Sequence, residues 1–502
     1  MGMVLGPVLQ FRGIRQKAWQ ISALVVVNTG EKVTITPSAS LKMLNTQCIA
    51  KIPFDAPRYD VYRMDFALEA HETQGKLTLE GKDYIFQAPL TADNPRVAFV
   101  SCNGFSDPKL MKSVIDKNDR WKDIALFHAQ QPYHILVMGG DQIYTDEMWN
   151  RLKTLHTWTD LPLEQRITAP FTDQMRKELD ELLCNIYLTR WAQPEVLAML
   201  SSIPTIMMWD DHDIFDGWGS YPEELHFSPV YQGIFKLAKR YFHTLQMQLN
   251  EKEVHPCALP GQSTYNMGFS SLGSIGILAL DLRSERRPAL KKTGPNLPSQ
   301  VVSPESWESI YKWLDNQKKL KHLLVISSIP VAYLNLNVLE RILSVVPGQQ
   351  ELEDDLRDHW RSTTNSQERL RLIHRLLKFS GDQKTRITIL SGDVHVAAAA
   401  VIESTRECAS RNACVINQLV SSGVVHPAPP SMVRYVLESI ADKEEQVDRG
   451  ITSNLQQLNT RGTRLIGARN WLAIEPDGSN NLWANWHVEG EIEPLTKVIH
   501  PV

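Results

Sequence analysis

The stretch Trp209-Asp210-Asp211-His212-Asp213 decides how this chain is interpreted, because it directly follows the apolar run Ile203 to Met208. Carboxylates and imidazoles are buried in proteins when they are paired or bound to a metal, since removing them from water otherwise costs too much free energy. The stretch begins where a buried strand would emerge into a loop. It therefore predicts a functional cluster of charged side chains at a strand end.

Two other segments repeat this arrangement. An apolar run at 135–138 leads into Gly139-Gly140-Asp141-Gln142-Ile143-Tyr144, and a run at 387–390 leads into Ser391-Gly392-Asp393-Val394-His395. Acidic residues at the ends of apolar strands are typical of a metal site with more than one ion on an open α/β sheet.

The composition limits the class of protein. With 502 residues, the chain is long enough for one large catalytic domain and a smaller one. A hydrophobic fraction of 43% and a charged fraction of 22% are ordinary for a globular protein. The formal net charge of −4 gives no electrostatic case for a nucleic-acid partner.

The sequence also favours a cellular location. We expect no signal peptide, because the first residues lack a basic segment followed by a sustained apolar run. We expect no membrane span, because no apolar run approaches the roughly 20 residues that cross a bilayer. Six scattered cysteines without a C-x-x-C pair do not form the pattern of a disulfide framework and fit a reducing compartment. These features predict a cytoplasmic protein and leave its oligomeric state open.

Two domains are expected. Residues 1–94 predict a small β-sandwich-like domain, with a half-buried strand at 19–27 and further strands at 58–68 and 76–86. From 95 to 502, short apolar runs alternate with helical stretches such as 174–191, which predicts a layered α/β domain. The charged stretch 351–368 is interpreted as a solvated loop or helix, and the Trp-rich segment 470–487 as terminal strands.

Asp141 and Tyr144 form a G-D-x-x-Y unit. A carboxylate can bridge two cations, and a phenolate three residues later can reach the same metal, for which iron is the expected ion. The alternative is a turn aspartate beside a buried tyrosine. Cys102 follows another apolar run and offers a thiolate for iron, or else is an inert buried thiol.

Asp393 and His395 form a G-D-x-H unit. Alternation along an extended segment places both side chains on one face, where they can bind neighbouring metals as a hard oxygen donor and a borderline nitrogen donor. The alternative is a hydrogen-bonded pair.

The cluster at 210–212 offers one or two carboxylate ligands, Asp210 and Asp211, followed by His212, which can protonate a leaving alkoxide. The alternative is an ion-paired structural cluster. Arg283, after the run 275–280, presents a fork of donors that matches phosphate oxygens. It could equally form a salt bridge to Asp281 or lie on a surface loop.

Taken in chain order, these motifs resemble those of the alkaline phosphatase D family of calcineurin-like metallophosphoesterases. The resemblance spans about residues 97 to 430 and rests on Ser101-Cys102-Asn103, Gly140-Asp141-Gln142-Ile143-Tyr144, Trp209-Asp210-Asp211-His212-Asp213, Leu280-Asp281-Leu282-Arg283, Asp358-His359-Trp360 and Ser391-Gly392-Asp393-Val394-His395.

The resemblance implies an α/β fold with a four-layer metallophosphoesterase core, in which helices flank two sheets, preceded by a small β-sandwich domain. It also implies a mixed Fe3+ and Ca2+ site, with another divalent metal possible at the second position. Cys102, Asp141, Tyr144 and His395 would hold iron, with Asp141 bridging, and Asp393 with Asp210 or Asp211 would face calcium. His212 would be the acid and Arg283 a phosphate clamp.

One position departs from the family pattern. The family has an asparagine shortly after the W-D-D-H motif, and this chain has Asp216 there. Either Asp216 replaces that asparagine, or the ligand shell of the second metal differs.

We therefore expect a metal-dependent phosphoesterase that hydrolyses phosphate monoesters, diesters or both with metal-activated water. Its substrate would be a small-molecule, lipid or nucleotide phosphate ester. One alternative is a non-catalytic binding or scaffold protein that retains the fold, against which the presence of Asp141, Asp393 and His395 argues. A second is an iron redox enzyme, against which the surplus of carboxylates and Arg283 argue.

Overall fold

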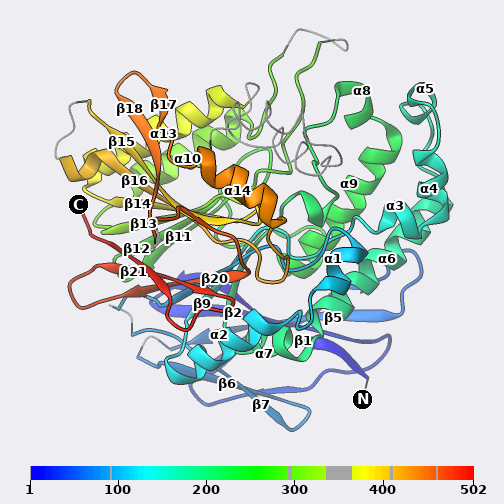
Figure 1. The fold of residues 1–502 in the computed structure, drawn as a ribbon. Coiled ribbons are helices and arrows are strands. Elements are labelled where there is room, and N and C mark those ends of the chain that lie inside the picture. Colours follow the sequence, from blue (N-terminus) through cyan, green and yellow to red (C-terminus); the bar gives the residue numbers. More distant parts are fainter. Residues whose placement is uncertain are drawn as a thin grey trace.

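The computed structural model of the chain is a mixed α/β structure with more than one sheet (Figure 1). It describes residues 2–69, 71–90, 93–291, 297–334, 365–406, 411–458 and 462–502. The motif Asp358-His359-Trp360 and most of the charged stretch 351–368 lie outside these residues.

The first sheet holds the strands that lead to the predicted motifs. Its spatial order is β22 (Leu495–Ile499), β21 (Leu482–Val488), β20 (Asn470–Pro476), β8 (Val97–Val100), β9 (Ile135–Gly139), β10 (Thr205–Met208), β1 (Met3–Arg15), β2 (Ala18–Asn28), β5 (Tyr59–Leu68) and β4 (Leu41–Ile52). The four consecutive strands β8, β9, β10 and β1 are parallel.

The second large sheet has the order β11 (Met267–Leu272), β12 (Ile275–Ala279), β13 (His322–Ile326), β14 (Arg386–Ser391), β16 (Val415–Val420), β15 (Ala397–Ser404), β18 (Ile451–Gln456) and β17 (Glu445–Asp448), with β19 (Leu465–Ile466) paired to β15. Its strands β12, β13, β14 and β16 are parallel. A smaller sheet contains β3 (Ile35–Pro37), β6 (Gln74–Leu79) and β7 (Lys82–Gln87).

The two large sheets share one hydrophobic core. On β13, Leu324 and Ile326 belong to the core that also contains the strands of the first sheet, whereas Leu323 and Val325 face a second core. This division follows from the alternation of side chains along a strand. Both faces of the central strands are therefore buried, which explains their continuous apolar runs.

Helices cover the remaining faces. The first core receives apolar residues from α2 (Asp119–Gln130), α4 (Lys153–Thr159), α6 (Asp173–Trp191), α7 (Pro194–Leu200) and α9 (Pro229–Tyr241). The second receives them from α10 (Pro304–Asn316), α13 (Ser366–Gln383) and α14 (Ser431–Ile440). The shorter helices are α1 (Pro108–Ser113), α3 (Met148–Arg151), α5 (Leu163–Arg166) and α8 (Glu223–His226).

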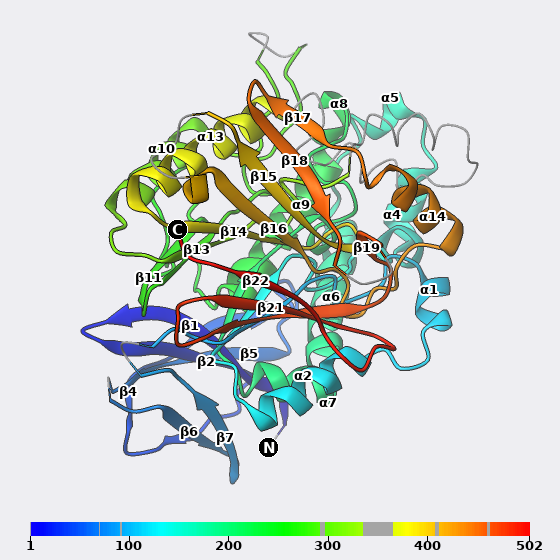
Figure 2. The ribbon, with the colours of Figure 1, turned by 60° about the vertical axis from the view of Figure 1, so that its left-hand side comes forward.

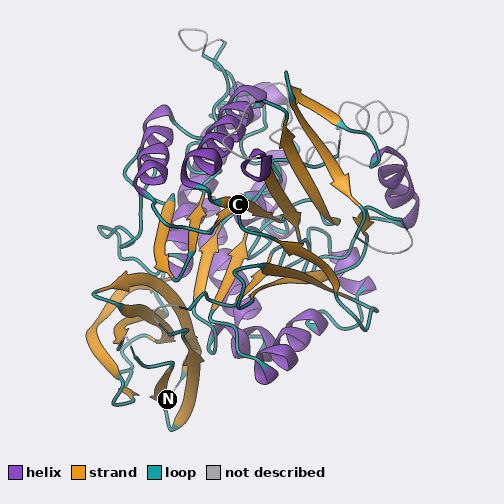
Figure 3. Ribbon diagram, turned by 90° about the vertical axis from the view of Figure 1, so that its left-hand side faces the viewer, coloured by secondary structure: helices purple, strands orange, loops and turns teal. Residues whose placement is uncertain are grey.

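The N-terminal strands are joined to the rest of the first sheet. Gln10 of β1 pairs in parallel with Thr205 of β10, and the hydroxyl of Thr205 donates to the carbonyl of Leu9 at 2.8 Å. Figure 3 shows these strands as a strongly curved group, and Figure 2 places β6 and β7 beside them. The strands β1, β2, β5 and β4 thus extend the large sheet. The separate domain expected at residues 1–94 stays a prediction.

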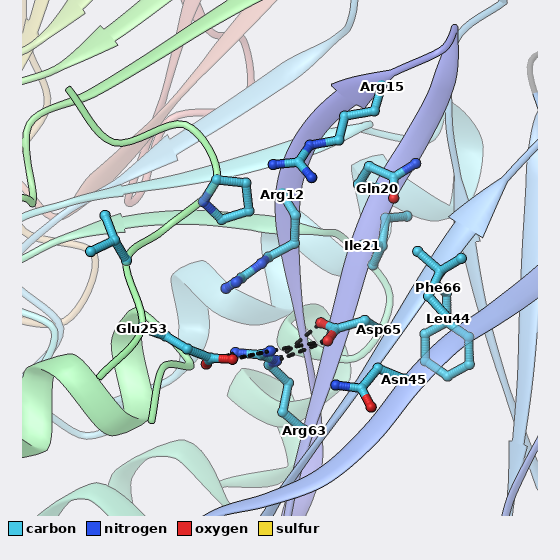
Figure 4. Close-up of a pocket in the computed structure, with 12 residues that line it drawn as sticks. Arg12, Arg15, Gln20, Ile21, Leu44, Asn45, Arg63, Asp65, Phe66 and Glu253 are labelled. Atoms are coloured by element: carbon cyan, nitrogen blue, oxygen red, sulfur yellow. Dashed lines mark hydrogen bonds and ion pairs between the residues drawn. The ribbon is translucent and has the colours of Figure 1, made fainter. Parts of the chain in front are cut away.

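An ion-pair cluster strengthens this junction. The guanidinium of Arg63 on β5 pairs with Asp65 at 3.0 Å and with Glu253, in the loop after α9, at 2.7 Å (Figure 4). The Arg63 side chain is 5% exposed, and it also donates to the carbonyl of Gln248. The cluster thus links the N-terminal strands to Glu253, which is 190 residues from Arg63 in the sequence.

Several predicted elements are confirmed. The helix expected at 174–191 is α6, and its first turn is capped by Thr172, whose hydroxyl accepts from the amide of Met175. The hairpin expected at 76–86 is β6 and β7, with Glu80 and Gly81 both at positive φ in the turn. The strand expected at 19–27 is β2, but the prediction that it is half-buried is wrong, because residues 21–27 are all buried.

Two other expectations concern location. Within the described residues, no helix is long and apolar enough to cross a membrane. Cys48, Cys102, Cys184 and Cys257 are free thiols, whereas Cys414 takes part in a disulfide that the cysteine spacing did not predict. The cytoplasmic location stays a prediction.

Candidate metal centre

The predicted site residues lie at the carboxyl ends of parallel strands in both large sheets. In the first sheet, Cys102 follows β8, Asp141 follows β9, and Asp210 and Asp211 follow β10. In the second sheet, Arg283 follows β12, and Asp393 and His395 follow β14. Ligands of open α/β sheets bind at this edge, where loops from several strands meet.

Two overlapping groups of buried side chains have the geometry of a metal site. In one group, ligand atoms of Asp141, Asp211 and His212 all lie within 4.8 Å of one another. In the other, those of Asp210, Asp211 and Asp393 do so. Asp211 belongs to both groups, so the arrangement can hold neighbouring cations.

The chemistry of the donors tests whether a cation fits. Oδ1 of Asp141 and Nδ1 of His395 are buried and have no hydrogen-bond partner among the described residues. A buried polar atom without a partner carries a large desolvation cost, which a bound cation would remove. Burial also lowers the pKa of His395 well below its usual value, so its ring is neutral and can donate a lone pair.

Asp141 stands next to two of the three other predicted iron ligands, Cys102 and Tyr144. Its Oδ2 lies 3.5 Å from Sγ of Cys102 and 3.5 Å from the hydroxyl of Tyr144. Burial, followed by the Asp141 charge, raises the pKa of the Cys102 thiol well above its usual value. Burial, with Cys102 and Asp141, does the same for Tyr144. The three groups would all ionise only beside a strong positive charge.

The backbone is strained at these positions. Cys102, Asp141, Asp393 and His395 have φ angles of 54°, 55°, 71° and 53°, in the left-handed region that non-glycine residues seldom adopt. Such strain gathers at functional sites, where the surrounding structure holds the residue in place. Gly104 also allows close packing, because a Cβ there would lie 2.4 Å from the Tyr144 ring.

His212 is held between an aspartate and an aromatic ring. Its Nδ1 lies 2.6 Å from Oδ2 of Asp146, and its ring stacks on Tyr144 with centroids 4.3 Å apart. Burial opposes protonation, but Asp146, Asp211 and Asp141 together raise the pKa of His212 well above its usual value. The surrounding carboxylates therefore favour the protonated form of the imidazole.

Arg283 is fully buried, so the surface-loop alternative is wrong. Its Nε donates to Oδ1 of Asp210, and its Nη2 lies 3.2 Å from Oδ1 of Asp211. Its Nη1 donates to the carbonyl of Trp218 at 2.9 Å. The guanidinium thus lies directly against the two carboxylates of the W-D-D-H motif.

Two other aspartates of this region have structural contacts. Asp213 accepts hydrogen bonds from the backbone amides of Asp210, Gln142 and Ile143, which fixes the two loops together. The amide of Asp216 donates to Oδ1 of Asp146 at 2.8 Å. Asp216 lies outside the two groups of metal-ligand geometry found among the described residues, so its replacement of the family's asparagine stays a prediction.

Sequence reasoning missed three residues of the site. Asp146 contacts His212. It could have been found from the sequence, because it lies only two residues after the predicted ligand Tyr144. His426 stacks on His395 with centroids 3.7 Å apart and is buried. Ser422 accepts from the amide of His395 at 2.8 Å and lies 3.1 Å from Sγ of Cys102. Both follow β16, which is a strand-end position like those of the predicted ligands.

Comparisons with known proteins agree with this geometry. A family described as PhoD related phosphatase matches residues 94–350 and 337–461. The uncharacterized protein YGR266W of Saccharomyces cerevisiae is 25% identical over 540 residues, which cover 87% of this chain and 75% of that protein. The solved structure of PhoD superposes with a TM-score of 0.58 at 13% identity, covering 99% of this chain and 89% of PhoD, and it therefore supports the fold. With a family match across most of its length, the chain belongs to the PhoD related phosphatases.

Proposed function

We propose that this protein is a metal-dependent phosphoesterase that hydrolyses phosphate monoesters, diesters or both. The observation that carries the proposal is a cluster of buried carboxylates, in which Asp211 has ligand atoms within 4.8 Å of Asp141 and also of Asp210 and Asp393. Oδ1 of Asp141 and Nδ1 of His395 add to it, because these buried atoms have no hydrogen-bond partner among the described residues and each can offer a lone pair to a cation. Family membership supports a phosphatase rather than another metal enzyme.

The donor types suggest which metals would bind. Cys102, Asp141, Tyr144 and His395 would hold Fe3+, since they combine thiolate, carboxylate, phenolate and imidazole, and Asp141 would bridge. Asp393 with Asp210 or Asp211 would face Ca2+ or another divalent ion, because these ions prefer oxygen ligands. When bound, the metals would polarise the phosphate and supply a water acidic enough to attack phosphorus near neutral pH.

The protein's own groups would do the rest. His212 would give its proton to the departing alkoxide, and Asp146 would hold the imidazole in the orientation that this requires. Tyr144 stacks on His212 and limits the movement of the ring.

The contacts of Arg283 support a role in holding Asp210 and Asp211 in place. A direct contact between Arg283 and phosphate stays a prediction, since the guanidinium is fully buried against those two carboxylates.

The finer features expected from the sequence belong to the same proposal. A four-layer core is supported by the shared core of the two sheets and by the helices on their outer faces. The substrate would be a small-molecule, lipid or nucleotide phosphate ester, and the protein would act in the cytoplasm.

Substitution of Asp141 tests the proposal. Asp141→Asn should abolish turnover of 4-nitrophenyl phosphate and of bis(4-nitrophenyl) phosphate while circular dichroism stays unchanged, because an amide cannot bridge two cations. Asp93→Asn is the matched control and should retain turnover, because Asp93 precedes the amino end of β8 whereas Cys102 follows its carboxyl end. Near-normal turnover in Asp141→Asn would refute the metal assignment. No turnover by the metal-replete native protein would favour the non-catalytic alternative.

A further inference from the structure

A large pocket opens beside the candidate metal centre. Its volume is about 620 Å³, and its wall includes Asn103, Ser106 and Tyr144 on the side of the centre. The last part of α6 also lines it, with Ile186 and Arg190, and α1 contributes Met111. In Figure 1, α1 and α6 lie on the same side of the molecule. The volume falls in the range of sites that bind small molecules.

Arg190 brings a positive charge to this wall, and its hydrogen-bond partners among the described residues are side-chain amides. Its Nε and Nη2 donate to Oδ1 of Asn103, and its Nη1 donates to Oδ1 of Asn118. No ion pair to Arg190 occurs in the described part of the chain. Burial lowers the pKa of Arg190 to about 10, against the opposing effect of Glu195, so the group remains charged at neutral pH.

Two other arginines that line pockets differ in this respect. Arg151, at the rim of the same pocket, pairs with Glu147 at 2.7 Å. Arg63, at a different pocket, pairs with both Asp65 and Glu253 (Figure 4). A partly buried guanidinium that is bonded only to neutral amides keeps its net charge and still has N–H groups that can donate. Such a group can bind a carboxylate or a phosphate, because its N–H groups match the spacing of their oxygens.

Part of the remaining wall suits the same ligand, and the one carboxylate there besides Glu147, that of Asp107, caps α1 by accepting from the amide of Lys109. Lys117 lines the pocket, is exposed, and has no side-chain partner among the residues described. Phe105, Met111 and Ile186 supply an apolar surface that can contact the body of a leaving group.

The pocket is coupled to the metal centre through one residue. Asn103 directly follows Cys102 in the sequence. The backbone N–H of Asn103 donates to the backbone carbonyl of Asp141 at 2.8 Å. The same residue accepts from Arg190, so the guanidinium is fixed relative to the proposed iron ligands.

We propose that this pocket binds the leaving group of the substrate, and that the substrate is a phosphate ester whose leaving group carries a second anionic group, bound by Arg190 and assisted by Lys117. The inference rests on the proposed function and adds the chemical class of the substrate.

Paired substrates test this inference. The acids are phenyl phosphates that carry a meta carboxylate, a para carboxylate or a para carboxymethyl group, and each is compared with its neutral methyl ester. For at least one pair, the ratio of kcat/KM for the acid to kcat/KM for the ester should fall about 10- to 100-fold in Arg190→Gln, as expected for a hydrogen bond between charged groups. Because both members use one metal centre, damage to that centre by the substitution cancels in the ratio.

Two further variants keep the test independent of folding. Lys117→Gln removes an exposed side chain and should lower the same ratio, by less than Arg190→Gln does. Arg176→Gln is the matched control, because Arg176 lies on the same helix and pairs with Asp173 at 3.1 Å away from the pocket, and it should leave the ratio unchanged.

A binding measurement separates this inference from the proposed function. Titration of metal-free protein with the free phenols, followed by NMR of the ligands, should show tighter binding of the acid than of its methyl ester, and Arg190→Gln should remove the difference. Turnover of all esters with equal ratios in the native protein and in Arg190→Gln would overturn the inference alone. Absence of turnover together with Arg190-dependent binding would overturn the hydrolytic function and leave the anion pocket in place.

Discussion

Nδ1 of His212 lies 2.6 Å from Oδ2 of Asp146, and the two residues come from different loops at the carboxyl edge of the first sheet. A carboxylate on one ring nitrogen fixes the orientation of an imidazole and stabilises its protonated form. Among the described residues the other ring nitrogen has no hydrogen-bond partner, which is what the proposed acid requires. This pair defines the acid in the proposed reaction.

Substitution of His212 should separate substrates by their leaving groups. In His212→Ala, turnover of an alkyl phosphate should fall about 10²- to 10⁴-fold, the usual contribution of general acid catalysis. A nitrophenyl ester should lose much less, because its leaving group departs without a proton. Metal content, measured on the same samples, should not change. Equal losses for both esters together with loss of metal would identify His212 as a ligand, which its place in one of the two ligand groups permits.

Asp146 should control the pH dependence of that step. Although burial opposes protonation, Asp146 is the first of the carboxylates that raise the pKa of His212. A raised pKa keeps His212 protonated to higher pH. The contribution of general acid catalysis to turnover is therefore lost as the pH rises through that pKa. Asp146→Asn lowers the pKa, and the decline of alkyl phosphate turnover should therefore begin at lower pH than in the native protein. An unchanged pH profile in Asp146→Asn would show that the pair does not govern catalysis.

The strand-end motifs were predictable because they are local. Each ligand directly follows an apolar run, and parallel strands bring such ends to one edge, so Asp141, Asp210, Asp211 and Asp393 could be expected to meet. The contacts of Arg283 could not be predicted, since its partner Asp210 is 73 residues away and leaves no periodic signal. The pairing of β1 with β10 escaped prediction for the same reason.

Tyr144 should give the protein colour. A phenolate bound to Fe3+ produces a charge-transfer band in the visible range, and Tyr144→Phe should abolish the band while iron content is retained through the other ligands. Absorption spectra and iron analysis of the two proteins provide the measurement. A colourless native protein with a full complement of iron would leave Tyr144 as a packed aromatic residue, stacked on His212 and His426.

The junction between the N-terminal strands and the rest of the protein should depend on Arg63. Removing one partner of a buried ion pair costs about 3–5 kcal/mol, and Arg63→Ala should approach the lower end of that range because Glu253 is partly exposed. Lys76→Ala is the control, since its pair with Asp83 is exposed and should contribute little to stability. Urea unfolding of the three proteins would measure both. Equal midpoints for the two variants would exclude a stabilising role for the Arg63 cluster.

The most direct measurement of the central claim is metal content together with turnover. Protein purified without chelator should contain iron and a second metal, and should hydrolyse 4-nitrophenyl phosphate. Exhaustive chelation should remove both the metals and the activity, and addition of Fe3+ with Ca2+ should restore them in the native protein but not in Asp141→Asn. Full turnover by the metal-free protein would contradict the account.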